Sequence, residues 1–305
     1  MATGHSIQVA AISLSAVANI VLNSLVMIVI ARTPTLREDR TTLFMFSLAA
    51  SDLVFGVCIM TTSAVVCSHP EIRSDEFAPV FFTLSAWLLL TSVYNMCSVS
   101  LCKMLAVVYP LRYLALVTER RRYYVIVWNW TAGFILTAPM YFLIDQEWSE
   151  DLCSVRVGKI TSGNILAYLF VSQVIGGFLP ITLMVYANVR MFIVVVRTKR
   201  QVAAESFEIV AGSNGCVLQQ HTLSMSLVRS VRSSRNIIII CSVFVSIMTL
   251  ELMVAFTVPL QERQEQSSAQ VAIVWLVFNN SLINSLLYIV LHRSVRSAIM
   301  NLFRQ

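Results

Sequence analysis

The sequence has few charged residues, few glycines and few prolines for its length. Charged side chains make up 12% of the 305 residues, whereas about a quarter is usual in soluble domains. Only 9 Gly and 7 Pro are present, which argues against a disordered chain and against a barrel of short strands joined by tight turns. Apolar residues reach 57%, and the mean hydropathy is +0.75. The composition therefore indicates a membrane protein.

Histidine is also scarce, and no catalytic group can be assembled from the sequence. The 4 His residues are scattered, and no nucleophile lies near a base and a third residue that would orient it. The 7 Cys residues show no spacing typical of a metal site. We therefore expect no enzyme. The net charge of +6 is explained by basic residues kept on the cytoplasmic side of a membrane, so we expect no nucleic-acid partner.

Seven apolar runs are long enough to cross a bilayer, which takes about 20 residues. A helix satisfies its own backbone hydrogen bonds inside lipid, and the runs lack the strict alternation of barrel strands. We predict an all-α, seven-transmembrane-helix bundle that forms a single domain over residues 1–305. The predicted spans are residues 7–31, 41–67, 77–102, 123–144, 164–196, 236–260 and 269–291.

The basic residues predict the orientation of these spans. Most of the 22 Lys and Arg residues fall in the first, third and fifth connecting loops and after the last run, which marks these segments as cytoplasmic. The opposite side receives only Arg73, Arg156, Lys159 and Arg263. We therefore expect a multi-pass membrane protein, with its N-terminus on the outer side and its C-terminus in the cytoplasm.

The segment after the last run, residues 292–303, has the pattern of a short amphipathic helix. Val295, Ile299 and Phe303 recur every four residues, and Arg293 and Arg296 lie off that stripe. Such a helix rests in the membrane interface against anionic lipid. The alternative is a solvated basic tail.

Polar residues inside apolar runs are candidates for function, because they are costly in lipid. Asp52 lies in the second run, Ser92 in the third, and Asn280, Ser281 and Asn284 in the seventh. Together they could surround a sodium ion or a proton with oxygen atoms at mid-membrane depth. The alternative is an ordinary hydrogen-bonded polar core between helices.

These features together resemble the rhodopsin-like (class A) G-protein-coupled receptors over nearly the whole chain. The individual motifs are weak, but their order and spacing agree with the family. They are Asn23, "LAASD" with Asp52, Trp128 or Trp130 ahead of Pro139, "LAVVYPLRY", Pro180 and "NSLINSLLY" from Asn280 to Tyr288.

The resemblance implies a cell-surface receptor that binds an extracellular small molecule or peptide and signals through a heterotrimeric G protein. It implies no cofactor other than a sodium ion at Asp52. One alternative is a receptor-like protein that signals constitutively or not at all and acts as a partner or decoy. A transporter is the least favoured reading, because the sequence shows no inverted repeat and no pair of broken spans.

The resemblance also exposes departures at the cytoplasmic end of the third helix. The family's Asp-Arg-Tyr falls on Cys102, Lys103 and Met104, in a register set by Pro110. These four residues and Tyr288 are the expected G-protein-coupling residues. Lys carries a compact charge in place of the planar fork of Arg, and Cys102 cannot act as its carboxylate partner. Without the usual ion pair, we expect raised ligand-independent activity.

On the ligand side, the resemblance points to Glu251, Met248, Ser85 and Phe278. Glu251 lies one turn outside Met248, which replaces the family's Trp, and it favours a cationic ligand. A protonated, hydrogen-bonded Glu251 is the alternative. Ser85 stands at the family's amine-binding Asp position, and Phe278 stands where a retinal-binding Lys would be. Because the sixth and seventh helices lack their usual prolines, we expect both to be straighter.

Cys67 and Cys153 are the cysteines at or beyond the extracellular boundary, where disulfide bonds persist. The family joins the third helix to the second extracellular loop, but the third-helix position is Ala78 here. The resemblance therefore suggests a Cys67–Cys153 bridge, and two free thiols are the alternative.

Overall fold

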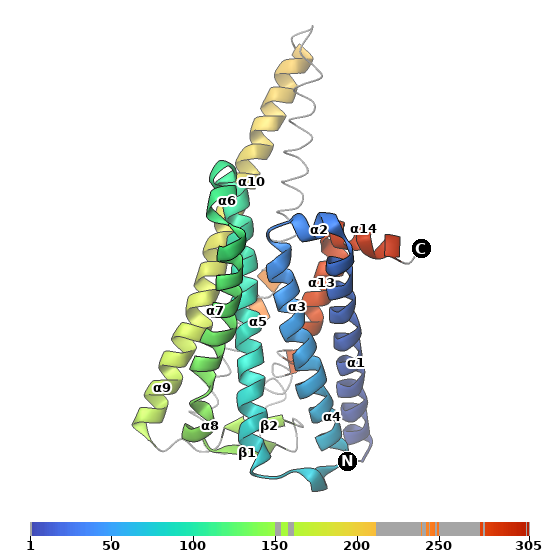
Figure 1. Ribbon diagram of the computed structural model, residues 1–305, viewed down its shortest axis with the longest axis vertical. Helices are drawn as coiled ribbons and strands as arrows, with labels where there is room; N and C mark the ends of the chain where they lie inside the picture. The colour runs from blue at the N-terminus through green and yellow to red at the C-terminus, as the bar shows by residue number, and fades with distance from the viewer. Residues whose placement is uncertain are drawn as a thin grey trace.

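The computed structural model describes residues 2–149, 154–157, 162–211 and 278–302, together with the positions 239, 242, 243, 245–247, 249, 275, 276 and 304. These residues form long helices that run side by side, with one short hairpin (Figure 1). Most of the predicted sixth span lies outside the described residues, as do Glu251, Met248 and Cys153.

The first part of the chain is almost entirely helical. A proline at the first turn of α2 and another at the start of η2 suit the fixed backbone angle of that residue. The elements are α1 (Ala2–Arg32), α2 (Pro34–Glu38), α3 (Thr42–Phe55), η1 (Gly56–Met60), α4 (Thr61–Ser68), η2 (Pro70–Ile72) and α5 (Phe77–Val108).

The helices that follow show clear start signals. Pro110 occupies the first turn of α6, and the Thr118 hydroxyl caps α7 by accepting a hydrogen bond from the Arg121 backbone at 3.4 Å. The elements are α6 (Pro110–Leu116), α7 (Glu119–Thr137), α8 (Met140–Leu143), α9 (Gly163–Gln173), η3 (Val174–Phe178), α10 (Leu179–Ala211), α13 (Asn280–Leu291) and α14 (Arg293–Leu302).

Five of the described helical segments are long and apolar enough to cross a membrane. Large apolar side chains such as Leu14, Val127 and Phe192 are exposed on them, which is expected of a surface covered by lipid. The segments are Ser6–Arg32, Thr42–Ser68, Phe77–Val108, Glu119–Leu143 and Gly163–Thr198. The shorter helix α13 is apolar over Asn280–Val290.

The two ends of the bundle carry different elements (Figure 1). At one end lie the start of α1, η2 and the hairpin, and we call this the hairpin end. At the other end lie α2, α6 and α14, and we call this the α14 end. Helix α10 continues well beyond the other helices at the α14 end (Figure 1).

The hairpin is a departure from the all-α prediction. β1 (Gln146–Ser149) pairs antiparallel with β2 (Ser154–Val157), and Trp148 lies opposite Val155. Val155 is buried against helix residues that include Phe81 and Ala78, and Trp148 packs on the same cluster. The segment is too short to show a strand period in the sequence, and its packing on α5 supplies the burial that a lone hairpin lacks.

Two helices contain a stretch of wider π-helix. In the second spanning segment η1 separates α3 from α4, and in the fifth η3 separates α9 from α10 just before Pro180. A π-turn holds one residue more than an α-turn, so it changes the direction in which the following side chains point. These turns are sources of distortion that need no proline.

Helix α13 is regular across Ser285, where the family has its proline, but the backbone departs from helical angles just before it, at Asn279. The expectation of a straighter helix stays a prediction. Regular helix α13 begins only at Asn280, because Asn279 has ψ 3°. The Asn279 side-chain amide and its backbone N–H both donate to the Trp275 carbonyl, at 2.8 and 3.1 Å. Local side-chain hydrogen bonds of this kind compete with regular helix.

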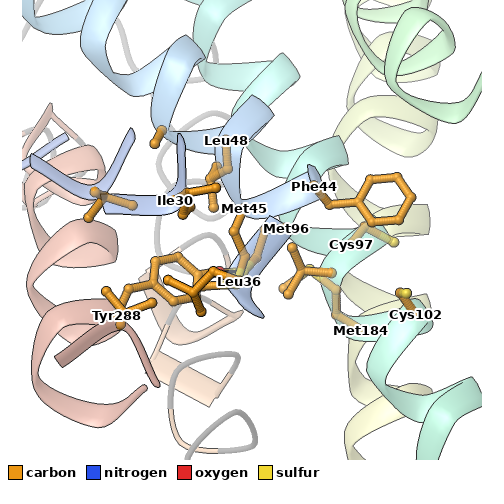
Figure 2. Close-up of a cluster of buried hydrophobic side chains, with 14 of the residues drawn as sticks. Ile30, Leu36, Phe44, Met45, Leu48, Met96, Cys97, Cys102, Met184 and Tyr288 are labelled. Atoms are coloured by element: carbon orange, nitrogen blue, oxygen red, sulfur yellow. Dashed lines mark hydrogen bonds between the residues drawn. The ribbon is translucent and has the colours of Figure 1, made fainter. Parts of the chain in front are cut away.

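A large apolar core fills the α14-end half of the bundle. Figure 2 shows side chains from α1, α3, α5, α10 and α13 converging there, with Met45 and Met96 between Leu48 and Tyr288. Leu36 of α2 closes this core, and Cys102 lies at its edge. A second cluster lies towards the hairpin end and contains Phe55, Ile59, Phe81 and Leu88.

Helix α14 turns away from α13 and lies across the end of the bundle (Figure 1). Val295 is fully buried and Ile299 nearly so, and both belong to the large core. Arg296 is exposed, and its guanidinium donates to the Val290 carbonyl at 3.1 Å. The stripe of apolar residues thus faces the protein core at Val295.

Candidate functional site

Asp52 lies at the centre of a buried polar cluster between α3 and α13. Its carboxylate accepts hydrogen bonds from the Ser281 hydroxyl at 2.9 Å and from the Asn284 amide at 3.5 Å. Ser92 of α5 also faces this carboxylate, although its hydroxyl does not reach hydrogen-bonding geometry. The three helices therefore meet at one carboxylate.

Several oxygen atoms of the predicted polar cluster have no hydrogen-bond partner among the described residues. They are the Asn280 and Asn284 Oδ1 atoms and the Ser92 Oγ atom, all buried. Buried polar atoms are rarely left unsatisfied unless something else binds there. A carboxylate with amide and hydroxyl oxygens is a ligand set that a hard cation prefers, so the residues present fit the sodium ion that the family resemblance implies.

Asn23, the amide that the sequence singled out in the first helix, shows no hydrogen bond to Asp52. It donates instead to the Asn19 backbone carbonyl at 3.0 Å and to the Asn19 side-chain oxygen. Asn19 in turn donates to the Asp52 backbone carbonyl at 3.0 Å and to the Met60 sulfur at 3.4 Å. Asn19 was missed by sequence reasoning, although an amide one turn before Asn23 on the same helix face was a usable signal.

Close packing around Asn19 depends on a glycine. A Cβ atom added at Gly56 would come within 2.8 Å of the Asn19 amide nitrogen. Gly56 opens the π-turn η1, so the second spanning segment lies close to Asn19 of α1 where its helix widens. Asn19 and η1 thus connect α1 with the Asp52 cluster.

Lys103 has an acidic partner that the sequence did not reveal. Its Nζ atom lies 3.3 Å from Oδ2 of Asp39, in the turn between α2 and α3, and the two side chains are 14% and 35% exposed. The Thr41 backbone N–H donates to the other carboxylate oxygen of Asp39 at 2.9 Å. Burial raises the pKa of Asp39, but the Lys103 charge and these hydrogen bonds together hold it below its ordinary value. Asp39 is therefore a carboxylate at neutral pH.

Cys102 occupies the position of the family's acid and lies between two hydroxyl groups. Its sulfur is 3.6 Å from the Thr41 hydroxyl and 3.6 Å from the Tyr113 hydroxyl of α6. The side chain is buried. Burial raises the pKa of the Tyr113 hydroxyl, and the neighbouring thiol raises it further, so Tyr113 stays neutral at physiological pH.

Arg40, next to Asp39, holds the end of α6. Its guanidinium donates to the Leu114 carbonyl at 2.6 Å and also to the Val117 carbonyl. These carbonyls lie at the end of a helix, where they lack helical partners. Arg40 was not singled out by the sequence analysis, because nothing in the spacing relates it to a segment more than 70 residues away.

His292 lies just beyond α13, close to the charges of Lys103 and Asp39. Its ring is 7% exposed, and neither ring nitrogen has a hydrogen-bond partner among the described residues. Burial lowers the pKa of His292 to about 4, helped by the positive charge of Lys103 and opposed by Asp39. The ring is therefore neutral at physiological pH.

The other predicted coupling residues lie around the same end of the bundle. Met104 is buried in the large core, and Pro110 starts α6. Tyr288 is buried, and its hydroxyl donates to the Met96 sulfur at 3.3 Å. Tyr288 thus packs into the large core, where Figure 2 shows it with Met45 and Met96.

Towards the hairpin end, two of the four predicted ligand residues are described. The Ser85 hydroxyl donates to the Phe81 carbonyl of its own helix at 2.6 Å. The Phe278 ring meets the Phe55 ring edge to face, with centroids 5.5 Å apart. Above them, the Trp148 ring of the hairpin stacks on Phe77 with centroids 6.3 Å apart, and its N–H donates to the Ser74 carbonyl at 3.0 Å. The hairpin therefore covers the start of α5.

The structure distinguishes the two candidate tryptophans of the fourth helix. Trp130 donates to the Ser47 hydroxyl of α3 at 3.1 Å, whereas the Trp128 side chain is 66% exposed. The Trp87 N–H of α5 donates to the Trp130 carbonyl at 2.9 Å. Trp130 is therefore the residue that joins α7 to its neighbours, and Trp128 faces outward.

Two asparagines form a further polar contact between α5 and α7. The Asn129 amide donates to the Asn95 side-chain oxygen at 3.1 Å and to the Ser98 hydroxyl at 3.0 Å. Asn129 and Asn95 are both buried. Such amide contacts join helices inside lipid.

Cys67 is disulfide-bonded. Cys58 and Cys102 carry free thiols. The predicted partner Cys153 lies outside the described residues, so the Cys67–Cys153 pairing stays a prediction. Among the described residues, no three His, Cys, Asp or Glu side chains gather closely enough to hold a metal ion.

Comparisons with known proteins find a matching family and relatives over most of the chain. The family described as "7 transmembrane receptor (rhodopsin family)" matches residues 22–288. The chain is 24% identical to the histamine H2 receptor of Rattus norvegicus over 99% of its own length and 83% of that protein. It is 22% identical to the D(1C) dopamine receptor of Xenopus laevis over 91% of its own length and 63% of that protein.

A shorter match shows higher identity. Over 38% of its length, the chain is 31% identical to octopamine receptor 1 of Lymnaea stagnalis, of which the match covers only 18%. The chain therefore corresponds to less than two thirds of the length of some of these relatives.

Proposed function

Because the chain belongs to the rhodopsin family of seven-transmembrane receptors, we propose that it binds an extracellular ligand and signals through a heterotrimeric G protein at the plasma membrane. Membership of this family makes it a receptor and not an enzyme. We propose seven spans, with the hairpin end outside the cell and the α14 end in the cytoplasm. The distribution of Lys and Arg supports this orientation.

The observation that carries the proposal is the contact between α3 and α13 at Asp52. A carboxylate hydrogen-bonded to Ser281 and Asn284 ties α3 to α13, so a relative movement of these two helices would disturb the cluster. Because the cluster is buried and polar, a change in its hydration or ion content shifts the balance between two packed arrangements. The buried cluster therefore supports a two-state protein over a rigid scaffold.

We propose a small cationic molecule as the ligand. Two relatives are named for histamine and dopamine, and acidic residues gather on the proposed extracellular side. Ser85 carries no charge and its hydroxyl is engaged within α5, so it cannot pair with a cation. We assign that role to Glu251, with Met248 and Phe278 beside it.

Lys103 is the residue that we expect to meet the G protein. It lies at the cytoplasmic end of α5, where a long cationic side chain can reach water. The loss of the Arg fork and of the neighbouring acid also fits the second candidate function, a receptor-like partner or decoy that does not couple. The two candidates differ in whether Lys103 matters for coupling.

The experiment is ligand-independent and ligand-stimulated G-protein recruitment in cells, with histamine and dopamine as probes. The parent, Lys103→Arg and Lys103→Ala variants are compared at matched surface levels. A coupling receptor recruits G protein with the parent and the Arg variant, and less with the Ala variant. Recruitment by none of the three would favour the decoy. Glu251→Gln tests the ligand assignment, since it should reduce stimulation without reducing ligand-independent recruitment.

A further inference from the structure

The turn between α2 and α3 holds three consecutive side chains that each reach a different part of the proposed cytoplasmic end. We call residues 39–41 the cytoplasmic turn. Asp39 binds Lys103 at 3.3 Å, Arg40 binds the carbonyls at the end of α6, and Thr41 lies 3.6 Å from the Cys102 sulfur. This short turn between α2 and α3 therefore contacts both α5 and α6.

The carboxylate of Asp39 is well placed for a lasting contact with Lys103. One of its oxygens accepts from the Thr41 backbone at 2.9 Å, which fixes the orientation of the carboxylate, and the other faces Lys103. The pair is shielded on one side, since Lys103 is only 14% exposed. An ion pair that is ordered and partly shielded from water contributes more stabilising free energy than a fully solvated surface pair.

The surrounding groups offer Lys103 no other acid among the described residues. Cys102 is uncharged and lies between Thr41 and Tyr113. His292 is buried and neutral, so it neither binds the Lys103 charge nor competes for Asp39. Among the described residues, only Asp39 forms a salt bridge with Lys103.

We propose that Asp39 restrains Lys103 in the uncoupled receptor, in place of the acid that Cys102 cannot supply. This restraint rests on the proposed function, because it regulates coupling through the same lysine. When Lys103 engages the G protein, it must leave Asp39, and the contacts of Arg40 and Thr41 carry that movement to α6 and α5. The receptor therefore keeps a restraint, but the acid comes from a different segment.

The first test is ligand-independent G-protein recruitment at matched surface levels. Asp39→Asn removes the charge at constant shape and should raise recruitment about two- to fivefold, the range expected for a partly shielded ion pair. Glu38→Gln, which removes a neighbouring exposed acid, should leave recruitment unchanged. Asp39→Glu keeps the charge and should stay close to the parent.

A double variant shows whether Asp39 acts through Lys103. In a Lys103→Ala background, Asp39→Asn should have no further effect on recruitment. A rise of the same size in both backgrounds would overturn the proposal, as would equal recruitment by the parent and Asp39→Asn. A loss of folding would lower the surface level and would not raise recruitment per receptor.

A second measurement does not depend on a G protein. Cys102 is a buried free thiol next to Lys103, so its alkylation by N-ethylmaleimide reports opening of this end of the bundle. The rate is followed by mass spectrometry of the Cys102 peptide in purified receptor. We expect Asp39→Asn to speed alkylation about two- to fivefold, and Glu38→Gln and Asp39→Glu to leave it near the parent rate.

The two measurements separate the two proposals. Faster Cys102 alkylation without recruitment by any variant would leave the restraint standing and reject the signalling function. Recruitment by the parent with unchanged Cys102 alkylation in Asp39→Asn would reject the restraint and leave the signalling function standing.

Discussion

The Ser281 hydroxyl donates a hydrogen bond of 2.9 Å to the Asp52 carboxylate, although 229 residues separate the two in the sequence. This contact joins α3 and α13. The Asp52 carboxylate is charged, and the Ser92 and Asn284 oxygen atoms have no hydrogen-bond partner among the described residues. We therefore expect ions and helix movements to affect this contact.

Sodium should stabilise the purified receptor through Asp52. If the surrounding oxygens bind the ion, sodium at ten times its dissociation constant adds about 1.4 kcal/mol to the free energy of unfolding. Asp52→Asn keeps the shape of the side chain and removes its charge, so the sodium-dependent rise in Tm should disappear. The measurement is thermal unfolding in sodium chloride against choline chloride. Asp145→Asn, at an exposed acid, is the control, and a sodium response that survives in Asp52→Asn would contradict the site.

Gly56→Ala should destabilise the receptor, because the new Cβ would lie 2.8 Å from the Asn19 amide nitrogen. Overpacking of this kind costs about 1–3 kcal/mol, and Asn19 would lose its hydrogen bond to the Asp52 carbonyl if it moved. Gly163→Ala is the matched control, since a Cβ there meets nothing within 4 Å. Thermal unfolding compares the two, and an equal Tm for both variants would show that α1 adjusts freely.

Trp130→Phe should lower stability more than Trp128→Phe. The first change leaves the Ser47 hydroxyl without its donor at 3.1 Å, and an unsatisfied buried polar group costs about 1–3 kcal/mol. The second change alters a side chain that is 66% exposed towards lipid. Surface expression and Tm measure the difference. If the exposed Trp128 proved the more sensitive, the assignment of Trp130 as the residue that joins the helices would be wrong.

The stability of the receptor should fall as the pH is lowered from about 6.5 to about 4, partly through His292. The folded protein keeps this ring neutral down to about pH 4, whereas the unfolded chain binds a proton near pH 6.5, so protonation favours unfolding in that window. A pKa shift of this size corresponds to a change in the free energy of unfolding on the order of 3 kcal/mol. Asp39 has a lowered pKa, so its contribution is lost only at still lower pH.

His292→Phe removes the titrating ring and should flatten the decline in Tm between pH 6.5 and pH 4. His69→Phe is the control, because His69 is exposed and pairs with Glu71 at the hairpin end. A parent receptor and a His292→Phe variant with the same pH profile would show that His292 does not titrate in this way.

The family and five long apolar helices could be predicted from the sequence, for a physical reason. A chain in lipid must form long apolar helices, and a polar residue in such a run is rare enough to be noticed. Asp52, Ser281 and Asn284 could thus be placed at a common depth before their contacts were seen. The family prediction is confirmed by the match over residues 22–288.

The partner of Lys103 could not be found in this way. Charged residues are common in connecting loops, so Asp39 did not stand out from its neighbour Glu38, and 64 residues separate it from Lys103. The expectation that Lys103 lacks its usual acidic partner rested on Cys102, at the position where the family keeps an acid. The hairpin was missed for a similar reason, since four-residue strands carry too few positions to show a period.

The π-turn η1 places one extra residue between the Asp52 cluster and Cys67. If Gly56–Met60 formed regular α-helix with all its residues kept, everything beyond it would rotate by about 100° around the helix axis. Cys67 would then point away from its disulfide partner, while Asp52 would keep its place. The relative orientation of the polar cluster and the disulfide therefore depends on the π-turn, and a chain that keeps all these residues but loses the π-turn must lose one of the two.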